Sequence, residues 1–360
     1  MNINATITPN KASDWPADGI EAVDACPLCG SRHRTLLHVG LTDRLFGAPG
    51  SWSLHRCTDC GLGYLAPRPT RQTIGLAYAN YSTHAPALKP KRTGILGNLR
   101  DCIRNGYLNR RYGYKLQPAP AWGYWAMYLL PAPIRWEQDQ HARHLPPPHS
   151  PCERLLDIGC GNGEFLINAR AAGWAVLGLE PDKQAASIGR QHGLEVHCTT
   201  YDCADLPPES FDVITSNQVI EHVHDPHAFV SRIHHWLKPG GTVWIGTPNL
   251  DSLMHAHFGI NYGNLHPPQH LLMFSPSTLR RLFEYHGFAS IEFHKRGFHD
   301  YSQSLGSAAL MRGEAGPSVY LGVKHAPLRD KIRGMYFELA AWRDFRACSD
   351  LVMLAKKASS

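Results

Sequence analysis

Long apolar runs are missing from this sequence of 360 residues. A membrane-spanning helix needs roughly 18 or more consecutive apolar residues, and no stretch of the sequence reaches that length. Residues 1–24 are polar and lack the apolar core of a secretory signal peptide. No internal repeat or low-complexity segment stands out either. These absences predict a globular chain that has no transmembrane span and stays in the cytoplasm.

A large excess of charge is missing as well. The chain has 36 basic and 30 acidic residues, a net charge of +6, which permits an acidic partner without requiring one. Apolar residues make up 43% of the sequence and charged residues 18%, so the chain can bury a full hydrophobic core. Its length suits one large domain with a smaller module, or two domains.

Cysteine is plentiful, with ten residues. In a reducing compartment this number favours metal binding or free thiols over disulfides. Two Cys-x-x-Cys-Gly motifs, at 26–30 and 57–61, suit a tetrahedral Zn²⁺ ion, and the glycine relaxes the turn after each pair. The predicted ligands of this structural site are Cys26, Cys29, Cys57 and Cys60. Because four sulfurs fill the site, the nearby His33 and His55 are predicted to be bystanders.

The zinc module is predicted to span residues 25–70, after a loose tail at 1–24. A helical connecting region follows at 71–149, and its basic residues are Lys89, Lys91, Arg92, Arg100, Arg104, Arg110, Arg111 and Lys115. Apolar side chains recur at helical spacing between 95 and 107, and residues 122–130 are rich in aromatic side chains. The segment could face lipid or a lipid-linked substrate. We favour the alternative, a helix packed on the catalytic domain with a solvated basic face.

The next domain begins near residue 150, after three consecutive prolines. Residues 154–158 read as a buried strand, and Gly159, Gly161 and Gly163 follow at alternate positions before a helical pattern. Strand, glycine turn and helix form the first unit of a doubly wound α/β domain. Glycines let the backbone approach a ligand closely. The Gly-x-Gly-x-Gly spacing differs from the Gly-x-Gly-x-x-Gly spacing of dinucleotide sites.

An acidic residue follows the second predicted strand. Residues 175–179 are apolar, and Glu180 stands 21 positions after Gly159. A gap of about 20 residues is usual between a glycine turn and an acid that accepts the ribose hydroxyls of a nucleotide. The pair therefore predicts a nucleotide site at this edge of the sheet.

Strands and helices alternate through the rest of the chain. Strands are predicted at 194–198, 211–216, 242–247, 289–294 and 349–357, and helices at 183–192, 226–237 and 277–286, with a further helix opening at 217–223 and mainly helical structure over 297–347. The pattern predicts an α/β fold: a doubly wound, Rossmann-like domain over residues 150–360 beside the small zinc-ribbon module.

Taken in order, these motifs resemble those of class I S-adenosylmethionine-dependent methyltransferases. The resemblance rests on the 157–163 turn, Glu180, Leu206-Pro207, Glu221-His222 and the Leu-Lys-Pro-Gly-Gly run at 237–241. The segment 57–69 and Tyr78-Ala79-Asn80-Tyr81 are similar to the zinc ribbons found on bacterial methyltransferases of glycan and natural-product pathways. The resemblance also implies that the last strand runs antiparallel.

The resemblance implies a set of S-adenosylmethionine contacts. They are Asp157, Gly159, Cys160, Gly161, Gly163, Glu180, Pro181, Asp202, Cys203, Asn217 and Gln218. By its spacing to Leu206-Pro207, Asp202 is the implied reader of the adenine amino group, and Asp205 is the competing choice. The segment 267–276 resembles the substrate side of the family.

Methyl transfer to a hydroxyl or a carbon acid needs a base, and histidine has a pKa near the working pH. The candidates are His222, which follows the fourth strand, and His266 and His270 in a loop rich in His, Tyr and Asn. Tyr262 in the same loop is a candidate to orient a substrate. For each histidine, a structural hydrogen bond is the competing interpretation.

Three hypotheses follow. The first is a methyltransferase that uses S-adenosylmethionine and a structural Zn²⁺ and acts on a small-molecule or glycan-type acceptor, including a lipid-linked one, by O- or C-methylation. The second is an RNA methyltransferase, since zinc ribbons also bind nucleic acid and the basic segment 89–115 is compatible with it, although the net charge is modest and the ribbon knuckles have few basic residues, Arg56 and Arg68. The third is an inactive regulator that binds the cofactor. The acceptor and the oligomeric state cannot be read from the sequence.

Overall fold

The structure is a computed structural model that describes residues 15–79, 94–316, 319 and 325–359. Asn80 and Tyr81 of the ribbon motif and the basic residues Lys89, Lys91 and Arg92 lie outside the described residues. Among the described residues, no helix has both the length and the apolar character that crossing a bilayer requires.

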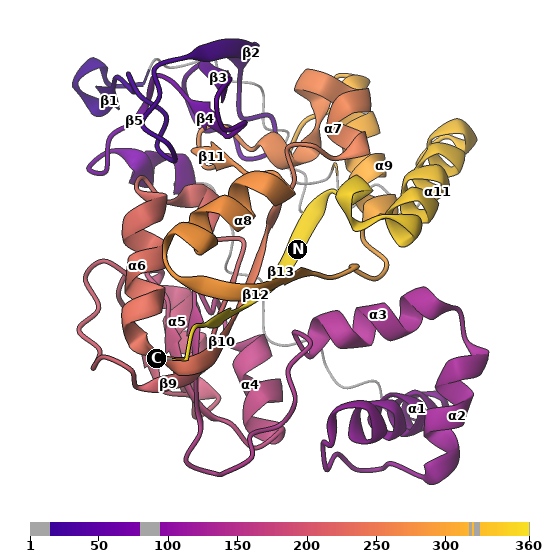
Figure 1. Cartoon of the computed structure of the whole chain (residues 1–360). Coiled ribbons are helices and arrows are strands. Elements are labelled where there is room, and N and C mark those ends of the chain that lie inside the picture. The colour runs from indigo at the N-terminus through magenta and orange to yellow at the C-terminus, as the bar shows by residue number, and fades with distance from the viewer. Residues whose placement is uncertain (1–14, 80–93, 317–318, 320–324, 360) are drawn as a thin grey trace.

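A seven-stranded sheet forms the centre of the larger domain (Figure 1). Its strands are β6 (Arg154–Ile158), β7 (Ala175–Leu179), β8 (Val196–His197), β9 (Phe211–Asn217), β10 (Leu237–Pro248), β12 (Phe288–Phe293) and β13 (Asp350–Lys357). Their order is β12-β13-β10-β9-β6-β7-β8. The strands β10, β9, β6, β7 and β8 run parallel, and β13 is antiparallel to both β10 and β12. The predicted Rossmann-like α/β fold with an antiparallel last strand is confirmed.

Helices cover both faces of this sheet. They are α4 (Glu164–Ala171), α5 (Lys183–Gln191), α6 (Pro226–Trp236) and α8 (Pro276–Tyr285). Successive side chains of a strand point to opposite faces, and β6 follows this rule. Leu155 packs with buried residues of α4 and α5, whereas Leu156 packs with those of α6 and α8. The continuous apolar runs in the sequence are thus strands buried on both sides.

The cysteine module, residues 15–79, lies at one end of the sheet (Figure 1). It contains η1 (Ala17–Gly19), β1 (Ile20–Glu21), β2 (Arg34–Leu41), β3 (Trp52–Cys57), β4 (Gly63–Leu65), β5 (Arg68–Pro69) and η2 (Ile74–Tyr78). The loose tail was predicted to extend to residue 24, but its last part is ordered. Strand β1 pairs with β5, and Trp15 is buried edge-on against Trp52. A short strand of the larger domain, β11 (Leu272–Met273), pairs with β4. The two predicted modules therefore share a sheet.

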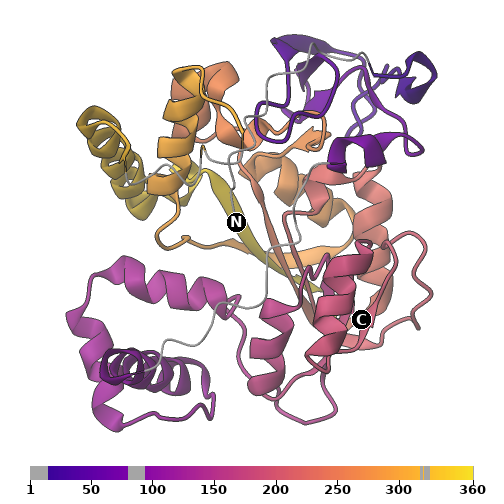
Figure 2. The ribbon, with the colours of Figure 1, turned by 180° about the vertical axis from the view of Figure 1, so that it is seen from behind.

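Three helices form the connecting region: α1 (Ile95–Tyr112), α2 (Ala121–Leu129) and α3 (Ala132–His141). In Figures 1 and 2 they lie to one side of the central sheet. The predicted amphipathic helix exists as α1, but its predicted packing is wrong at the N-terminal end. Ile95, Leu96 and Leu99 are exposed and do not pack on the catalytic domain, whereas Tyr107 is buried.

The remaining described helices of the domain follow β9, β10 and β12 in the chain. These are η3 (Ile220–His222), α7 (Leu253–Phe258), η4 (Gly259–Asn261), η5 (Gly263–Leu265), α9 (Asp300–Met311), α11 (Leu328–Arg343) and η7 (Phe345–Ala347). The predicted helix opening at 217–223 is a single 3-10 turn. Gln218 there adopts a left-handed conformation with φ of 57°, which an α-helix does not accommodate. This break turns the chain sharply at the end of β9.

Candidate functional site

The glycine turn after β6 is a tight backbone cradle. Gly159, Gly161 and Gly163 have φ values of 73°, 55° and 84°, a region that strains any residue with a Cβ. A Cβ on Gly159 would also lie 2.5 Å from the Val219 side chain, and one on Gly163 would lie 2.3 Å from the Leu194 side chain. At Gly161 a Cβ would meet nothing within 4 Å. The first and third glycines are therefore needed for packing, while Gly161 faces open space.

Glu180 closes one side of this cradle. The backbone amide of Gly161 donates to its Oε2 at 2.8 Å, and the amide of Asp182 donates to its Oε1 at 2.9 Å. Burial raises the pKa of Glu180, and the two amide bonds oppose that shift. Each carboxylate oxygen keeps a second lone pair. Glu180 can therefore accept two further hydrogen bonds beside the glycine turn.

Asp157 lies beneath the turn and is held by two groups. Arg143 forms a buried ion pair with its Oδ1, and the Thr215 hydroxyl donates to the same oxygen at 2.9 Å. The Arg143 guanidinium also lies 3.6 Å from the ring centroid of Phe165. The other oxygen, Oδ2, is buried and has no hydrogen-bond partner among the described residues. Asp157 is thus fixed in place through Oδ1, and its Oδ2 can accept a hydrogen bond from a ligand.

The other predicted cofactor residues differ in how far they are exposed. The Cys160 side chain points inward under it, where a Cβ on Gly178 would touch its sulfur, so only the backbone of Cys160 faces the cradle. Asp202 and Cys203 are exposed, and the Asp202 carboxylate pairs with Arg71 at 3.2 Å. Pro181 is exposed after Glu180.

The remaining two predicted cofactor residues, Asn217 and Gln218, lie at the end of β9. The Asn217 side-chain oxygen is buried and has no hydrogen-bond partner among the described residues, and Gln218 donates from Nε2 to Asp350 at 3.2 Å. Asn217 thus brings a second unpartnered acceptor to this edge of the sheet. The glycine cradle, the spare lone pairs of Glu180 and the unpartnered acceptors of Asp157 and Asn217 fit a nucleoside-type ligand rich in donors.

A buried carboxyl group and two histidines meet at the end of β9. One side-chain atom each from Glu221, His222 and His270 lies within 4.8 Å of the others. Glu221 is fully buried, accepts from the Thr247 hydroxyl at 3.0 Å through Oε2, and has no partner for Oε1 among the described residues. Burial raises the pKa of Glu221 to about 8. A carboxyl and two imidazoles are also a ligand set that could hold Zn²⁺ or a similar cation.

His222 is held in one tautomer. Its Nδ1 lies 2.8 Å from the backbone oxygen of Gln269 and 3.0 Å from the Tyr78 hydroxyl. A carbonyl oxygen can only accept, so Nδ1 carries the proton and Nε2 keeps its lone pair. Burial lowers the pKa of His222 to about 4. The ring is therefore neutral near pH 7, with a basic nitrogen opposite the tethered one.

The two loop histidines form a row with His222. The ring centroids of His222 and His270 are 4.7 Å apart, and His266 stacks on His270 at 4.9 Å. His270 donates from Nδ1 to the backbone oxygen of Asn264 at 2.7 Å, so its Nε2 is basic by the same argument. Burial lowers the pKa of His266 to about 4 and holds that of His270 well below its usual value. The structure therefore brings together the three histidines that were predicted from the sequence.

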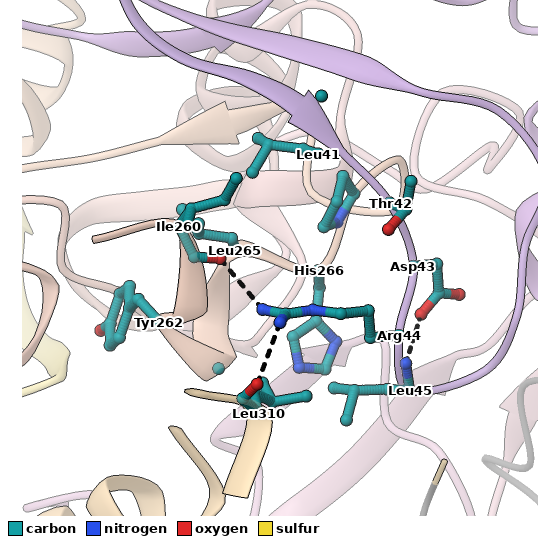
Figure 3. Close-up of a pocket in the computed structure, with 13 residues that line it drawn as sticks. Leu41, Thr42, Asp43, Arg44, Leu45, Ile260, Tyr262, Leu265, His266 and Leu310 are labelled. Carbon is teal, nitrogen blue, oxygen red and sulfur yellow. Dashed lines mark hydrogen bonds between the residues drawn. The ribbon is translucent and has the colours of Figure 1, made fainter. Parts of the chain in front are cut away.

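The row ends at a cavity of about 230 Å³ between the cysteine module and the histidine loop (Figure 3). His266 lies in its wall next to the Arg44 guanidinium, which donates to the backbone oxygens of Leu310 and Ile260, both at 3.1 Å. Tyr262 contributes its ring to the wall, and its hydroxyl donates to the Ser349 oxygen at 2.7 Å. This bond ties the loop to the residue before β13, so the Tyr262 hydroxyl would have to leave it to orient an acceptor.

The four predicted zinc ligands also come together. The sulfurs of Cys26 and Cys60, and those of Cys29 and Cys57, are 3.5 Å apart, and all four lie within 4.8 Å of one another. Zn–S bonds of about 2.3 Å place tetrahedral sulfurs about 3.8 Å apart, so the geometry fits. The hydrogen bond with Cys26 and burial raise the pKa of Cys60. Four sulfurs at this spacing could hold a divalent cation, and we propose Zn²⁺.

Sequence reasoning overlooked several residues of the site. Glu221 was noted only as the neighbour of His222, and Tyr78 only as part of the ribbon motif, yet both reach the histidine row. The Glu-His pair was the available signal for the first. Arg143 and Arg44 lie in segments without a motif, so no pattern pointed to them.

Comparisons with known proteins locate the relationship in the larger domain. Residues 133–292 match the family described as methyltransferase domain. The ubiquinone biosynthesis O-methyltransferase of Vibrio atlanticus is 33% identical over 104 residues, which cover 27% of this chain and 44% of that protein. The protein of the same name from Idiomarina loihiensis is 32% identical over 143 residues, which cover 36% of this chain and 59% of that protein. The chain thus spans about half the length of the curated relatives it matches.

One of the matching solved structures is that of a SAM-dependent methyltransferase from Thermotoga maritima. It is 19% identical in sequence, with a TM-score of 0.41, and the alignment covers 71% of this chain and 99% of that chain.

Proposed function

We propose that this chain, whose residues 133–292 match the methyltransferase domain family, transfers the methyl group of S-adenosylmethionine to a small-molecule or glycan-type acceptor. The observation that carries the proposal is the Glu180 carboxylate bonded to the Gly161 amide, at the edge of a cradle open at Gly161. When bound, the cofactor would supply a methyl group on a positive sulfur. The protein's task is then to hold it, exclude water and align the acceptor.

Each cofactor residue has a proposed role. Glu180 accepts from the ribose hydroxyls through its spare lone pairs. The unpartnered oxygens of Asp157 and Asn217 accept from donors of the methionine part. Asp202 reads the adenine amino group, and it then shares its carboxylate with Arg71. Asp205 remains the alternative reader.

His222 is the proposed general base. Its Nδ1 proton is committed to the Gln269 oxygen, which leaves Nε2 to take a proton from the acceptor nucleophile. The Glu221 carboxyl lies beside it, is neutral near pH 7 because burial raises its pKa to about 8, and can hold the acceptor by a hydrogen bond at its unpartnered Oε1. His270 is the competing base, since its tautomer is fixed in the same way.

The acceptor is proposed to enter through the cavity beside His266, which the histidine row connects to His222. Its volume of about 230 Å³ suits one ring of a small molecule. The matched relatives are named O-methyltransferases, which favours oxygen over carbon as the methylated atom. A glycan-type or lipid-linked acceptor would place only its reactive end there.

The cofactor half is tested by calorimetry with S-adenosylmethionine. Gly161→Arg should abolish binding, because the new side chain fills the cradle at a φ of 55°. Glu180→Ala should weaken binding by about tenfold or more, as expected for the loss of charge-assisted hydrogen bonds. Gly75→Arg is the matched control, since Gly75 has no neighbour within 4 Å. Failure of the unmodified chain to bind would overturn the proposal.

The catalytic half is tested by screening acceptors for S-adenosylhomocysteine release. His222→Ala should lower turnover about 100-fold or more, the usual range for a general base, while cofactor affinity stays the same. His235→Ala, an exposed histidine of α6, is the control. Equal turnover in both variants would exclude His222 as the base. Turnover that depends on added Mg²⁺ or Mn²⁺ would instead assign the Glu221–His222–His270 group to a metal.

The RNA hypothesis has less support. Arg56 pairs with Asp251 at 2.9 Å and Arg68 with Glu21 at 2.6 Å, so these two arginines beside the second cysteine motif already have internal partners. An affinity for RNA that falls steeply as the salt concentration rises would support the RNA hypothesis. Turnover with any acceptor would exclude the inactive regulator.

A further inference from the structure

Exposed apolar side chains are concentrated on the connecting helices. Seven of the twenty-one large apolar side chains that are exposed among the described residues belong to α1 and α2. They are Ile95, Leu96, Leu99, Trp122, Trp125, Tyr128 and Leu129. Ile95 and Leu129 are both 88% exposed, and Trp125 is 66% exposed. Scattered apolar residues on a surface need no explanation, but a cluster of this kind marks a binding surface.

The packing of the two helices turns this cluster outward. Gly106 of α1 and Gly123 of α2 meet at backbone contact, since a Cβ on Gly123 would lie 2.2 Å from the Cys102 oxygen. The buried face of α2 therefore contains Gly123 and Met127. Trp122, Trp125 and Leu129 recur at positions i, i+3 and i+7, which is one stripe of a helix. That stripe is directed away from α1 and faces solvent.

The surroundings of the cluster are basic. Residues 94–131, which span both helices, contain five basic residues and one acidic residue. The basic residues are Arg100, Arg104, Arg110, Arg111 and Lys115. The acidic one, Asp101, already pairs with Arg104 at 3.4 Å. The surface around the apolar stripe thus has a net positive charge.

We infer that the α1–α2 hairpin docks the protein on an anionic lipid bilayer, with Trp122, Trp125 and Leu129 inserted at the headgroup level. Tryptophan and tyrosine favour that level because one end of each ring system is apolar and the other polar. Arginine and lysine beside them are attracted to anionic lipids. The apolar stripe supplies burial, and the basic residues select the charge of the surface.

Another exposed stripe, on α11, is the natural comparison. Leu328, Ile332, Met335 and Leu339 are exposed at a spacing of four, three and four residues, but α11 has no tryptophan among its exposed residues. The two exposed tryptophans, which favour the headgroup level, therefore distinguish α1–α2 from α11 as the lipid-facing surface. The inference is independent of the proposed methyl transfer, because the experiment measures binding alone.

The test is cosedimentation of the full chain with phosphatidylcholine vesicles, with or without phosphatidylglycerol. Binding should require phosphatidylglycerol and fall as salt rises. Trp125→Ser/Leu129→Ser should weaken binding about tenfold or more, since both side chains leave the interface. Arg100→Gln/Lys115→Gln should weaken binding to the anionic vesicles and leave the circular dichroism spectrum unchanged. The matched control is Leu328→Ser/Ile332→Ser on α11, which should bind as the unmodified chain does.

Three outcomes would overturn the inference. If the unmodified chain does not bind vesicles, or if only the α11 variant loses binding, the hairpin is not a membrane-binding surface. A dimer that Trp125→Ser/Leu129→Ser converts to monomers in light scattering, without vesicle binding, would assign the surface to a second copy of the chain. Salt-dependent binding of a single-stranded RNA, lost in the same variant while vesicles are ignored, would assign it to nucleic acid.

Discussion

Asp300, the first residue of α9, has a buried carboxyl group. Its Oδ1 accepts from the Ser349 amide at 2.6 Å, and its Oδ2 has no hydrogen-bond partner among the described residues. Burial raises the pKa of Asp300 to about 7 in the folded chain, against an ordinary value of 3.8. The folded state therefore favours the protonated form, and the stability this contributes is present below pH 3.8 and lost as pH rises through 7.

Asp300→Asn should remove this pH dependence, because the amide stays neutral at every pH. Relative to the variant, the unmodified chain should lose about 1.4 kcal/mol of unfolding free energy for each pH unit between roughly 4 and 7. Urea denaturation at pH 5, 6 and 7 measures the difference. Asp18→Asn, in the exposed 3-10 turn η1, is the control. Parallel curves for the Asp300 variant and the unmodified chain would show that Asp300 is ionised in the folded protein.

Residues inside a motif could be located from the sequence, and residues that act through tertiary contact could not. The spacing of Gly159 and Glu180 predicted a shared site, and the two segments indeed meet at the Gly161 amide. The three candidate histidines also lie together. Arg143 reaches Asp157 from the connecting region, and Tyr78 reaches His222 across 144 positions of sequence. Contacts of this kind depend on how the modules dock, which local patterns do not contain.

Among the elements, the α1–α2 hairpin depends on one close contact. A methyl group on Gly123 would overlap the backbone oxygen of Cys102, and a backbone atom cannot move aside as a flexible side chain does. Gly123→Ala should therefore separate the helices at a cost of about 1–3 kcal/mol, as for other overpacked sites. Hydrogen exchange should become faster in α1 and α2 alone, while S-adenosylmethionine affinity is kept.

Gly75→Ala is the matched control for this change, because a Cβ there meets nothing within 4 Å. Its exchange should equal that of the unmodified chain. Unchanged protection of α1 and α2 in Gly123→Ala would mean that the helices can slide apart without loss, and the outward direction of the tryptophan stripe would then need another explanation.

The elements themselves were largely predictable, because buried parallel strands and amphipathic helices have strong patterns. The predicted strand at 211–216 and helix at 183–192 differ from β9 and α5 by one residue at one end. The segment 217–223 was predicted as a helix and is a 3-10 turn, since β10 captures the Gln218 amide through the Gly246 oxygen. The tail at 15–24 was predicted as loose and is ordered by Trp52 and β5. In both cases a partner distant in sequence decides the local structure.

At the scale of the whole molecule, the cysteine module and the histidine row are mechanically joined. Strand β4 pairs with β11, and the Leu65 amide donates to the Leu271 oxygen at 3.0 Å. The Leu271 amide then donates to the backbone oxygen of Glu221 at 2.8 Å. The Gln269 side chain, whose backbone oxygen holds His222, donates to Asp43 of the module at 3.0 Å. Two routes of two hydrogen bonds each thus link the module to Glu221 and to His222, the proposed base.

Removal of the proposed zinc should therefore lower turnover although no cysteine touches the reacting atoms. Structural zinc contributes folding free energy directly, so Cys57→Ser should lower metal content and loosen β3 and β4, and with them β11 and the loop at 262–271. Turnover should fall while S-adenosylmethionine affinity changes little, because the glycine cradle and Glu180 directly follow β6 and β7 of the central sheet. Cys152→Ser, an exposed cysteine outside the module, is the control. Metal analysis, hydrogen exchange and S-adenosylhomocysteine release measure the three effects. If Cys57→Ser lost its metal yet kept full turnover, the module would be an independent domain and the link through β11 would carry no functional weight.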